Sequence, residues 1–231
     1  MKVDFQRPFA APLGAQELIL VRHGSVTQPR GEQGPPIGRQ NDPPLDERGR
    51  HQAAAVAVRL EDEPIAAVFA TPLRRTVETA APLAELGRHE PRILDDLREV
   101  ELGDWEHGEL TRRAAAGDPA FARVMREQRW ELIPNAESAI SFAERVARGI
   151  AEAAAASGPD SVAVAYTHSA VIAEACRQVT SSQAFAFMAV SNASLTRLVR
   201  MPDGRWVLLS FNETAHLPIE YQARLKRGDG S

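Results

Sequence analysis

The sequence predicts an α/β protein: a three-layer α/β/α sandwich with a mostly parallel central sheet, a C-terminal antiparallel hairpin and a lid insertion of loops and helices. Three short apolar runs predict buried strands, at residues 18–21, 65–69 and 161–165. Each run is almost continuous and does not alternate with polar residues, which is typical of strands buried on both faces. Helical patterns separate the runs and supply the crossover connections that parallel strands need.

Three helices are predicted between these strands. Residues 47–60 are rich in alanine and place apolar side chains at helical spacing. Thr71 and Pro72 form an N-cap and first-turn pair, and the helix that they open extends to about Leu86. Residues 142–156 contain strong helix formers and end at a Ser-Gly-Pro stop.

The C-terminal part of the chain has a different pattern. Residues 193–199 and 206–211 flank a Pro-Asp-Gly turn, which predicts an antiparallel hairpin at the edge of the sheet. Residues 31–44 form a loop rich in glycine and proline, and residues 97–131 give mixed signals with a helix near 120–129. We expect one domain over residues 1–231, with an N-terminal extension at 1–16 and a lid or cap insertion at about 97–137.

The composition is that of an ordinary globular protein, 44% hydrophobic and 25% charged. A net charge of −4 gives the surface no general attraction for nucleic acid or for an anionic membrane. The only cysteine, Cys176, allows no intrachain disulfide and fits a cytoplasmic location. Neither a secretory signal nor an apolar run of roughly 20 residues is present, so we expect no membrane partner.

Charged and polar residues follow each of the three apolar runs. The first run leads into Arg22 and His23, the second into Arg74 and Arg75, and the third into His168. In an open α/β sheet, ligands bind beyond the carboxyl ends of the strands. Guanidiniums offer forked donors that match phosphate oxygens, and a neutral imidazole is a competent nucleophile. The pattern predicts an anion site, with phosphate as the best fit.

The first of these segments, Leu20-Val21-Arg22-His23-Gly24, resembles the signature of the histidine phosphatase superfamily, also called phosphoglycerate-mutase-like. Further blocks resemble that family's motifs and occur in the family's order. They lie at residues 45–53, 71–80, 97–99, 103–106, 136–138, 167–169 and 191–194. Together they extend over most of the chain, so the resemblance is specific.

The resemblance implies a role for each site residue. His23 is the nucleophile and becomes phosphohistidine, while Arg22, Arg75 and His168 hold the phosphoryl oxygens. Glu99 protonates the departing alkoxide and then helps to activate water, with Glu101, two positions further on, as the alternative acid. Arg74 remains solvated. The resemblance implies no cofactor and no metal, and the sequence has no HExxH, paired CxxC or phosphate-loop motif.

Several positions depart from the family pattern. Ser25 stands directly after the Arg-His-Gly signature, where the family usually has Glu, Gln or a similar residue, and Pro29 replaces a common phosphate-contacting Asn. His107 replaces a glycine, and Ser169 replaces the glycine after the second histidine. We expect Ser25, His107 and Ser169 at the rim of the substrate pocket. These changes leave the identity of the substrate undetermined, but they do not alter the chemistry that the resemblance implies.

The leading hypothesis is a phosphomonoester phosphatase that acts on a small cytosolic phosphorylated metabolite. The segment Gly103-Asp104-Trp105-Glu106 is closer to the phosphatase branch than to the mutases. A phosphoglycerate-mutase-type isomerase is the first alternative. The second is a catalytically weak relative that binds phosphate or a phosphoprotein. A homodimer is left open, and no nucleic-acid partner is expected.

Overall fold

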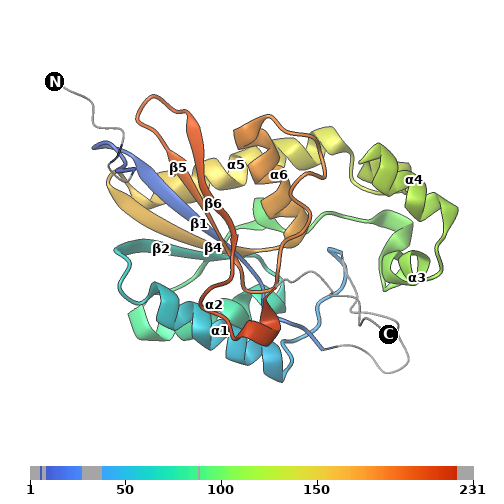
Figure 1. Ribbon diagram of the computed structural model, residues 1–231, viewed down its shortest axis with the longest axis horizontal. Helices are drawn as coiled ribbons and strands as arrows, with labels where there is room; N and C mark the ends of the chain where they lie inside the picture. Colours follow the sequence, from blue (N-terminus) through green and yellow to red (C-terminus); the bar gives the residue numbers. More distant parts are fainter. Residues whose placement is uncertain (1–5, 7–8, 28–37, 88, 223–231) are drawn as a thin grey trace.

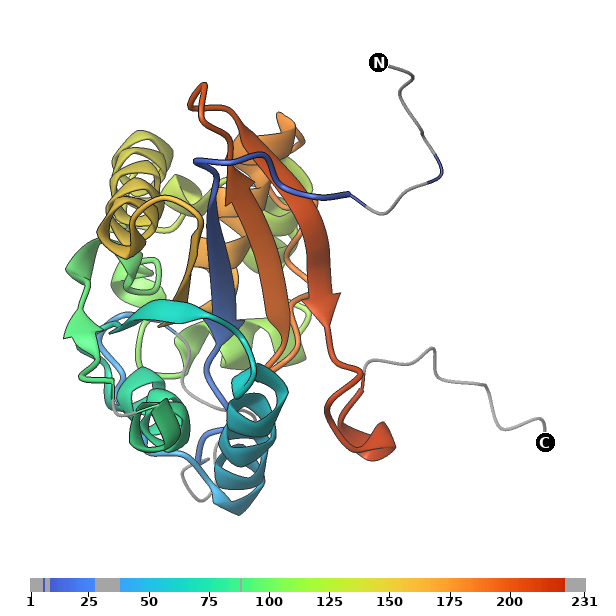
Figure 2. The ribbon, with the colours of Figure 1, turned by 90° about the vertical axis from the view of Figure 1, so that its left-hand side faces the viewer.

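The computed structural model describes residues 6, 9–27, 38–87 and 89–222. They form a six-stranded sheet of order β3-β2-β4-β1-β5-β6 (Figure 1). The strands are β1 (Gln16–Arg22), β2 (Ile65–Ala70), β3 (Arg92–Ile93), β4 (Ser161–Thr167), β5 (Leu195–Arg200) and β6 (Trp206–Glu213). β1 to β4 are mutually parallel, whereas β5 is antiparallel to β1 and β6 to β5. Figure 2 shows this hairpin beside β1, which confirms the predicted sheet.

Helices cover both faces of the sheet, as the three-layer prediction requires. α1 (Glu47–Leu60) and α2 (Arg74–Gly87) pack on one face, and α5 (Ala139–Ser157) and α6 (Ser169–Thr180) on the other. α3 (Glu109–Ala115) and α4 (Pro119–Glu127) project to one side (Figure 1). The 3₁₀ turns are η1 (Asp95–Leu97), η2 (Gly103–Trp105), η3 (Trp130–Leu132) and η4 (Ile219–Tyr221).

Alternate residues of β1 face opposite helical layers, which explains its continuous apolar sequence. Ile19 and Val21 belong to the core that includes α1 and α2. Leu18 and Leu20 belong to the core that includes α5 and α6. All four side chains are fully buried. At ~25 cal/mol per Å² of apolar surface, each such side chain contributes about 1.5–3 kcal/mol to folding.

Two local predictions need correction. Thr71 caps a turn by accepting a hydrogen bond from the Leu73 amide at 3.3 Å, but the α-helix starts only at Arg74. The single helix expected near 120–129 is α4, and a second one, α3, precedes it. α3 was missed because only one of its seven residues is buried, so it has no apolar stripe.

Cys176 is buried in α6, and burial raises the pKa of its thiol to about 12. Among the described helices, none combines the length and the apolar character needed to cross a bilayer. Pro29 and residues 31–37 of the predicted loop lie outside the described residues.

Candidate active site

Three parallel strands bring the predicted residues to one edge of the sheet. β1 pairs with β4 so that Arg22 lies opposite Thr167, and β2 pairs with β4 up to Ala70 and Tyr166. His23 follows β1 directly, and His168 follows β4 as the N-cap residue of α6. Arg75 lies in the first turn of α2, shortly after β2. The carboxyl ends of the three strands lie at the same edge of the sheet, so the side chains that follow them lie close together.

His23 is buried, with 7% of its surface exposed. Its Nδ1 lies 2.8 Å from the carbonyl oxygen of Gly24, which can only accept a hydrogen bond. Nδ1 therefore carries the proton and Nε2 keeps its lone pair. Burial, followed by the charges of Arg75 and Arg22, holds the pKa of His23 well below its usual value. The imidazole is neutral, and Nε2 is its unprotonated nitrogen.

The segment around His23 is fixed by contacts from distant parts of the chain. The amide of His23 donates to the carbonyl of Thr167 at 3.0 Å, and Asn192 Nδ2 donates to the carbonyl of His23 at 3.0 Å. Gly24 approaches α1 so closely that a Cβ there would lie 2.7 Å from the carbonyl oxygen of Gly49. Only glycine fits this contact without a backbone shift.

His168 is fully buried next to His23. Its Nε2 lies 3.0 Å from Thr71 Oγ1, whereas its Nδ1 has no hydrogen-bond partner among the described residues. Burial, and then the charge of Arg75, holds its pKa well below the usual value. A buried ring nitrogen without a partner is costly, and an incoming phosphoryl oxygen would satisfy it. The sequence pattern identified Thr71 as a cap but missed this contact.

Two arginines supply the positive charge of the site, and backbone carbonyls orient both. Arg22 Nη1 donates to the carbonyl of Val190 at 2.5 Å. Arg75 donates from Nη1 to the carbonyl of Asn41 at 2.5 Å and from Nη2 to that of Gly38 at 3.1 Å. Carbonyl acceptors fix a guanidinium without cancelling its charge. Arg75 is therefore held in the site with its positive charge available to an anion.

The neighbouring arginine has different surroundings. Arg74 is largely exposed and forms an ion pair with Glu78 on the same helix. Because residues 74 and 75 point in different directions on α2, only Arg75 lies among the charged groups of the site.

Glu99 is the buried carboxyl of the site, with 3% exposure. Its Oε1 accepts a hydrogen bond from the amide of Val100 at 3.0 Å, and its Oε2 accepts one from Ser169 Oγ at 3.3 Å. Burial raises its pKa, against the opposing effects of the Val100 amide and of Arg75 and Arg22. A raised pKa suits a carboxyl that donates a proton.

Glu101, the alternative acid, lies in a different environment. Its side chain is 35% exposed and forms an ion pair with Arg39 at 3.1 Å. Its other oxygen accepts a hydrogen bond from Gln40 Nε2 at 3.3 Å. Glu99, not Glu101, therefore faces Arg22 and Arg75.

Of the predicted rim positions, Ser25 stabilises the start of α1. Its Oγ donates to Asp46, the N-cap residue, at 2.7 Å, and its amide donates to Gln52 Oε1 at 2.8 Å. Ser169 instead contacts Glu99 through its hydroxyl. The serine that replaces a family glycine is therefore in contact with the carboxyl of the site.

His107 lies at the base of the projecting helices. It is exposed, has a positive φ of 55°, and places Nδ1 3.1 Å from Asn41 Oδ1. The carbonyl of Asn41 in turn accepts a hydrogen bond from Arg75. His107 thus touches the segment that orients Arg75.

Glu106 is a buried residue whose role the sequence patterns missed, although it lies within the Trp-Glu block. Its carboxylate accepts hydrogen bonds from the amides of Leu102 at 2.9 Å, Arg39 at 3.0 Å and Gln40 at 3.2 Å, and from Asn41 Nδ2 at 3.3 Å. It therefore ties residues 38–41, which orient Arg75, to the beginning of the predicted lid. Among the described residues, no group of three His, Cys, Asp or Glu side chains could hold a metal ion.

Comparison with known proteins identifies the family. The model of the histidine phosphatase superfamily (branch 1) matches residues 18–214. Phosphoserine phosphatase 1 of Hydrogenobacter thermophilus is 30% identical over 208 residues, covering 87% of this chain and 94% of that protein. An uncharacterized protein of Mycobacterium tuberculosis is 40% identical over 105 residues. That match spans 46% of this chain and about half, 48%, of the relative.

The fold is also that of a solved relative. The native structure of a mycobacterial glucosyl-3-phosphoglycerate phosphatase superposes with a TM-score of 0.70 at 28% identity. The superposition covers 87% of this chain and 100% of that one. The similarity therefore extends over most of this chain and all of the solved one.

Proposed function

This chain belongs to the histidine phosphatase superfamily, and we propose that it is a phosphomonoesterase acting through a phosphohistidine on His23. The observation that carries the proposal is the neutral imidazole of His23, with Nε2 unprotonated, beside the guanidiniums of Arg22 and Arg75. Neutralising charge on the equatorial oxygens is the main catalytic task in phosphoryl transfer. Fixed guanidiniums perform that task without reorganising.

In the first step, the lone pair of His23 Nε2 forms a bond to phosphorus as the ester P–O bond breaks. The electron pair of that bond leaves with the alkoxide oxygen, to which Glu99 transfers its proton. Arg22, Arg75 and Nδ1–H of His168 hold the phosphoryl oxygens, with Thr71 donating its hydroxyl hydrogen to His168 Nε2. The alcohol leaves, and the enzyme keeps a phosphoryl group on nitrogen.

In the second step, water attacks the phosphorus atom as the P–N bond breaks. The carboxylate of Glu99 accepts a proton from this water, and the electron pair of the P–N bond returns to His23 Nε2. Inorganic phosphate leaves, and both His23 and Glu99 regain their starting states. The same carboxyl acts first as acid and then as base, which its raised pKa favours.

The direct test compares the purified protein with its His23→Ala variant in hydrolysis of p-nitrophenyl phosphate. We expect at least a ~1,000-fold loss of rate, as for removal of other enzyme nucleophiles. Rapid quenching should trap an acid-labile phosphoryl group on His23 of the unmodified enzyme. Equal activity of both proteins would rule out His23 as nucleophile. Inactivity of both would favour the phosphate-binding alternative.

We propose a small phosphomonoester as the substrate. Relatives in this family are named for phosphoserine and for glucosyl-3-phosphoglycerate. A panel containing both of these, 3-phosphoglycerate and a phosphopeptide, ranked by kcat/KM, tests the substrate class. A dominant phosphopeptide would contradict the small-molecule proposal. Formation of 2-phosphoglycerate from 3-phosphoglycerate without release of phosphate would favour the mutase alternative.

A further inference from the structure

The segment that carries Glu99 is irregular and buried. After η1, residues 98–102 form neither helix nor strand, and Leu97, Glu99, Val100 and Leu102 are all buried. Backbone carbonyls in such a segment need hydrogen-bond partners from elsewhere in the molecule. Thr167 Oγ1 donates to the carbonyl of Leu97 at 2.7 Å, and the Glu137 amide donates to that of Glu101 at 2.9 Å.

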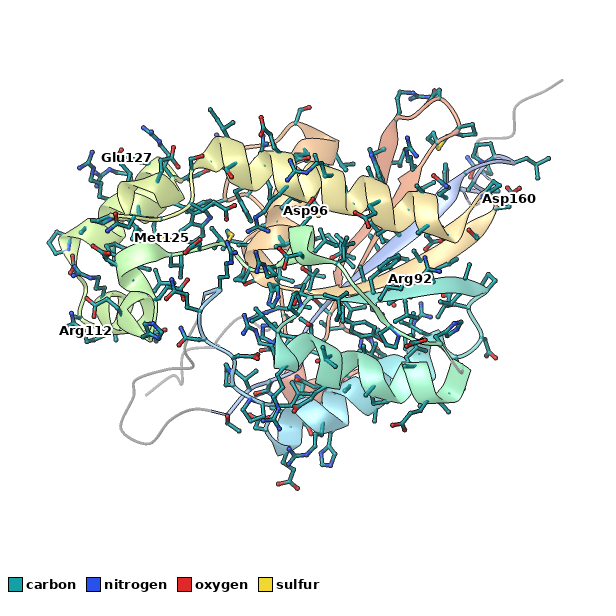
Figure 3. All side chains as sticks on the ribbon, turned by 180° about the vertical axis from the view of Figure 1, so that it is seen from behind. Arg92, Asp96, Arg112, Met125, Glu127 and Asp160 are labelled. Atoms are coloured by element: carbon teal, nitrogen blue, oxygen red, sulfur yellow. The ribbon has the colours of Figure 1, made fainter. Side chains whose placement is uncertain are left out.

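One side chain from α5 binds three of the other carbonyls. Arg145 Nη1 donates to the carbonyls of Asp96 at 2.9 Å and Arg98 at 2.6 Å. Its Nη2 donates to the carbonyl of Glu99 at 3.1 Å. Figure 3 shows Asp96 beside α5, where this contact is made. The backbone on both sides of the proposed acid is therefore attached to one guanidinium.

A largely buried carboxylate, that of Glu137, holds this guanidinium in place. Arg145 Nε and Nη2 donate to the two oxygens of Glu137 at 2.7 and 2.8 Å. The side chains are only 10% and 9% exposed. The five N–H groups of Arg145 thus match five acceptors, three carbonyls and two carboxylate oxygens. A lysine has three donors on one nitrogen and cannot make this set of bonds.

We propose that Arg145, oriented by Glu137, is a positioning residue that holds Glu99 where it can protonate the leaving group. The inference rests on the proposed function, in which Glu99 is the general acid. Arg145 touches the backbone of Glu99 and not the reacting atoms, so its effect on catalysis passes through the placement of that carboxyl.

The dependence on the leaving group distinguishes this role from general structural support. An alkoxide needs a proton in order to leave, whereas p-nitrophenolate leaves without one. kcat/KM reports the steps up to departure of the leaving group. A displaced Glu99 should therefore lower kcat/KM for an alkyl monoester and leave that for p-nitrophenyl phosphate nearly unchanged.

The experiment compares Arg145→Lys with a matched control, Arg148→Lys. Arg148 lies one turn further along α5, and its one hydrogen-bonding partner among the described residues is the side chain of Asp96, at 3.1 Å, with 61% of its own side chain exposed. For Arg145→Lys we expect the loss in kcat/KM to be at least ~10-fold larger for the best alkyl substrate than for p-nitrophenyl phosphate. For Arg148→Lys, both values should stay within ~2-fold of the original.

The Glu99→Gln background completes the test. If Arg145 acts through Glu99, Arg145→Lys should cause no further loss selective for the alkyl substrate once the acid is gone. Equal losses on both substrates, or an undiminished loss in the Glu99→Gln background, would overturn the positioning role. If Glu99→Gln itself causes no alkyl-selective loss, the proposed acid is wrong, which is a separate failure.

A second variant covers the case in which Arg145→Lys does not fold. Glu137→Gln keeps the shape of the side chain that binds Arg145 but removes its charge, so Arg145 should be held less firmly. The loss of kcat/KM that is selective for the alkyl substrate should then appear again, but should be smaller than in Arg145→Lys. A folded Glu137→Gln protein with unchanged kcat/KM for both substrates would contradict the proposal.

Discussion

The imidazole rings of His23 and His168 lie 5.3 Å apart, centroid to centroid, with their planes inclined by 58°. Both rings are buried, and Arg22 and Arg75 are close enough to lower the pKa of each. Two protonated rings at this separation would repel each other and the guanidiniums. The free site therefore combines two neutral imidazoles with two fixed positive charges, an arrangement that an anionic substrate completes.

Burial of neutral histidines predicts that stability falls with falling pH. In the unfolded chain a histidine binds a proton below about pH 6.5, whereas folded His23 does not until a lower pH. Between these values the unfolded state binds more protons, so the free energy of unfolding decreases by ~1 kcal/mol per histidine from pH 6.5 to 5.5. Urea unfolding of the unmodified protein and of His23→Gln in phosphate-free buffer measures this. Between pH 6.5 and 5.5, the free energy of unfolding should decrease by about 1 kcal/mol less in the variant than in the unmodified protein. Equal decreases in the two proteins would contradict a neutral His23.

Thr71 should matter to catalysis through His168. Thr71→Val keeps the volume but removes the hydroxyl that meets His168 Nε2. Loss of a buried hydrogen bond of about 1–2 kcal/mol should lower kcat/KM ~5- to 30-fold. The loss should be the same for alkyl and p-nitrophenyl esters, because the phosphoryl group is common to both. Thr71→Ser keeps the hydroxyl and should retain most of the activity; a Thr71→Val enzyme with full activity would exclude this role.

Ser169 should affect the pH dependence of the acid. Its hydroxyl donates to Glu99 Oε2, which favours the ionised carboxylate. Ser169→Ala removes that donor and should raise the pKa of Glu99 further, so the fall of kcat/KM for an alkyl ester at rising pH should begin at a higher pH. Ser169→Thr retains a hydroxyl and is the matched control. A shift to lower pH, or no shift, would contradict the contact.

Gly38 should be required for the orientation of Arg75. Its φ is +117°, and a Cβ there would lie 2.1 Å from Glu106 Oε2. Gly38→Ala should displace the carbonyl that accepts from Arg75, lower kcat/KM ~10-fold or more and weaken inhibition by inorganic phosphate to a similar extent. Gly117→Ala is the control, because Gly117 has a positive φ of +63° but no atom within 4 Å of the added Cβ. It should cost about 1 kcal/mol of stability and leave kinetics unchanged. Equal kinetic effects of the two substitutions would refute the role of Gly38.

Much of the fold was readable from local patterns. The runs at 18–21, 65–69 and 161–165 lie within β1, β2 and β4, because a strand covered on both faces needs apolar residues at every position. The C-terminal hairpin followed from its turn residues. β3 was not foreseen, since it consists of only two exposed residues, which are too few to form a strand pattern. The start of α2 was misplaced by two residues, from Pro72 to Arg74, because the Thr71 hydroxyl caps a turn that precedes the α-helix.

The sequence by itself determined which residue types stand at the ends of the central strands, and their order along the chain. Only the tertiary structure decided that Glu99, rather than Glu101, faces Arg22 and Arg75, and that Thr71, Glu106 and Arg145 support the site. Propensity and periodicity act over a few neighbouring residues. The bond between Arg145 and the carbonyl of Glu99 joins positions 46 residues apart, so it exists only because α5 packs against an irregular segment that no local pattern describes.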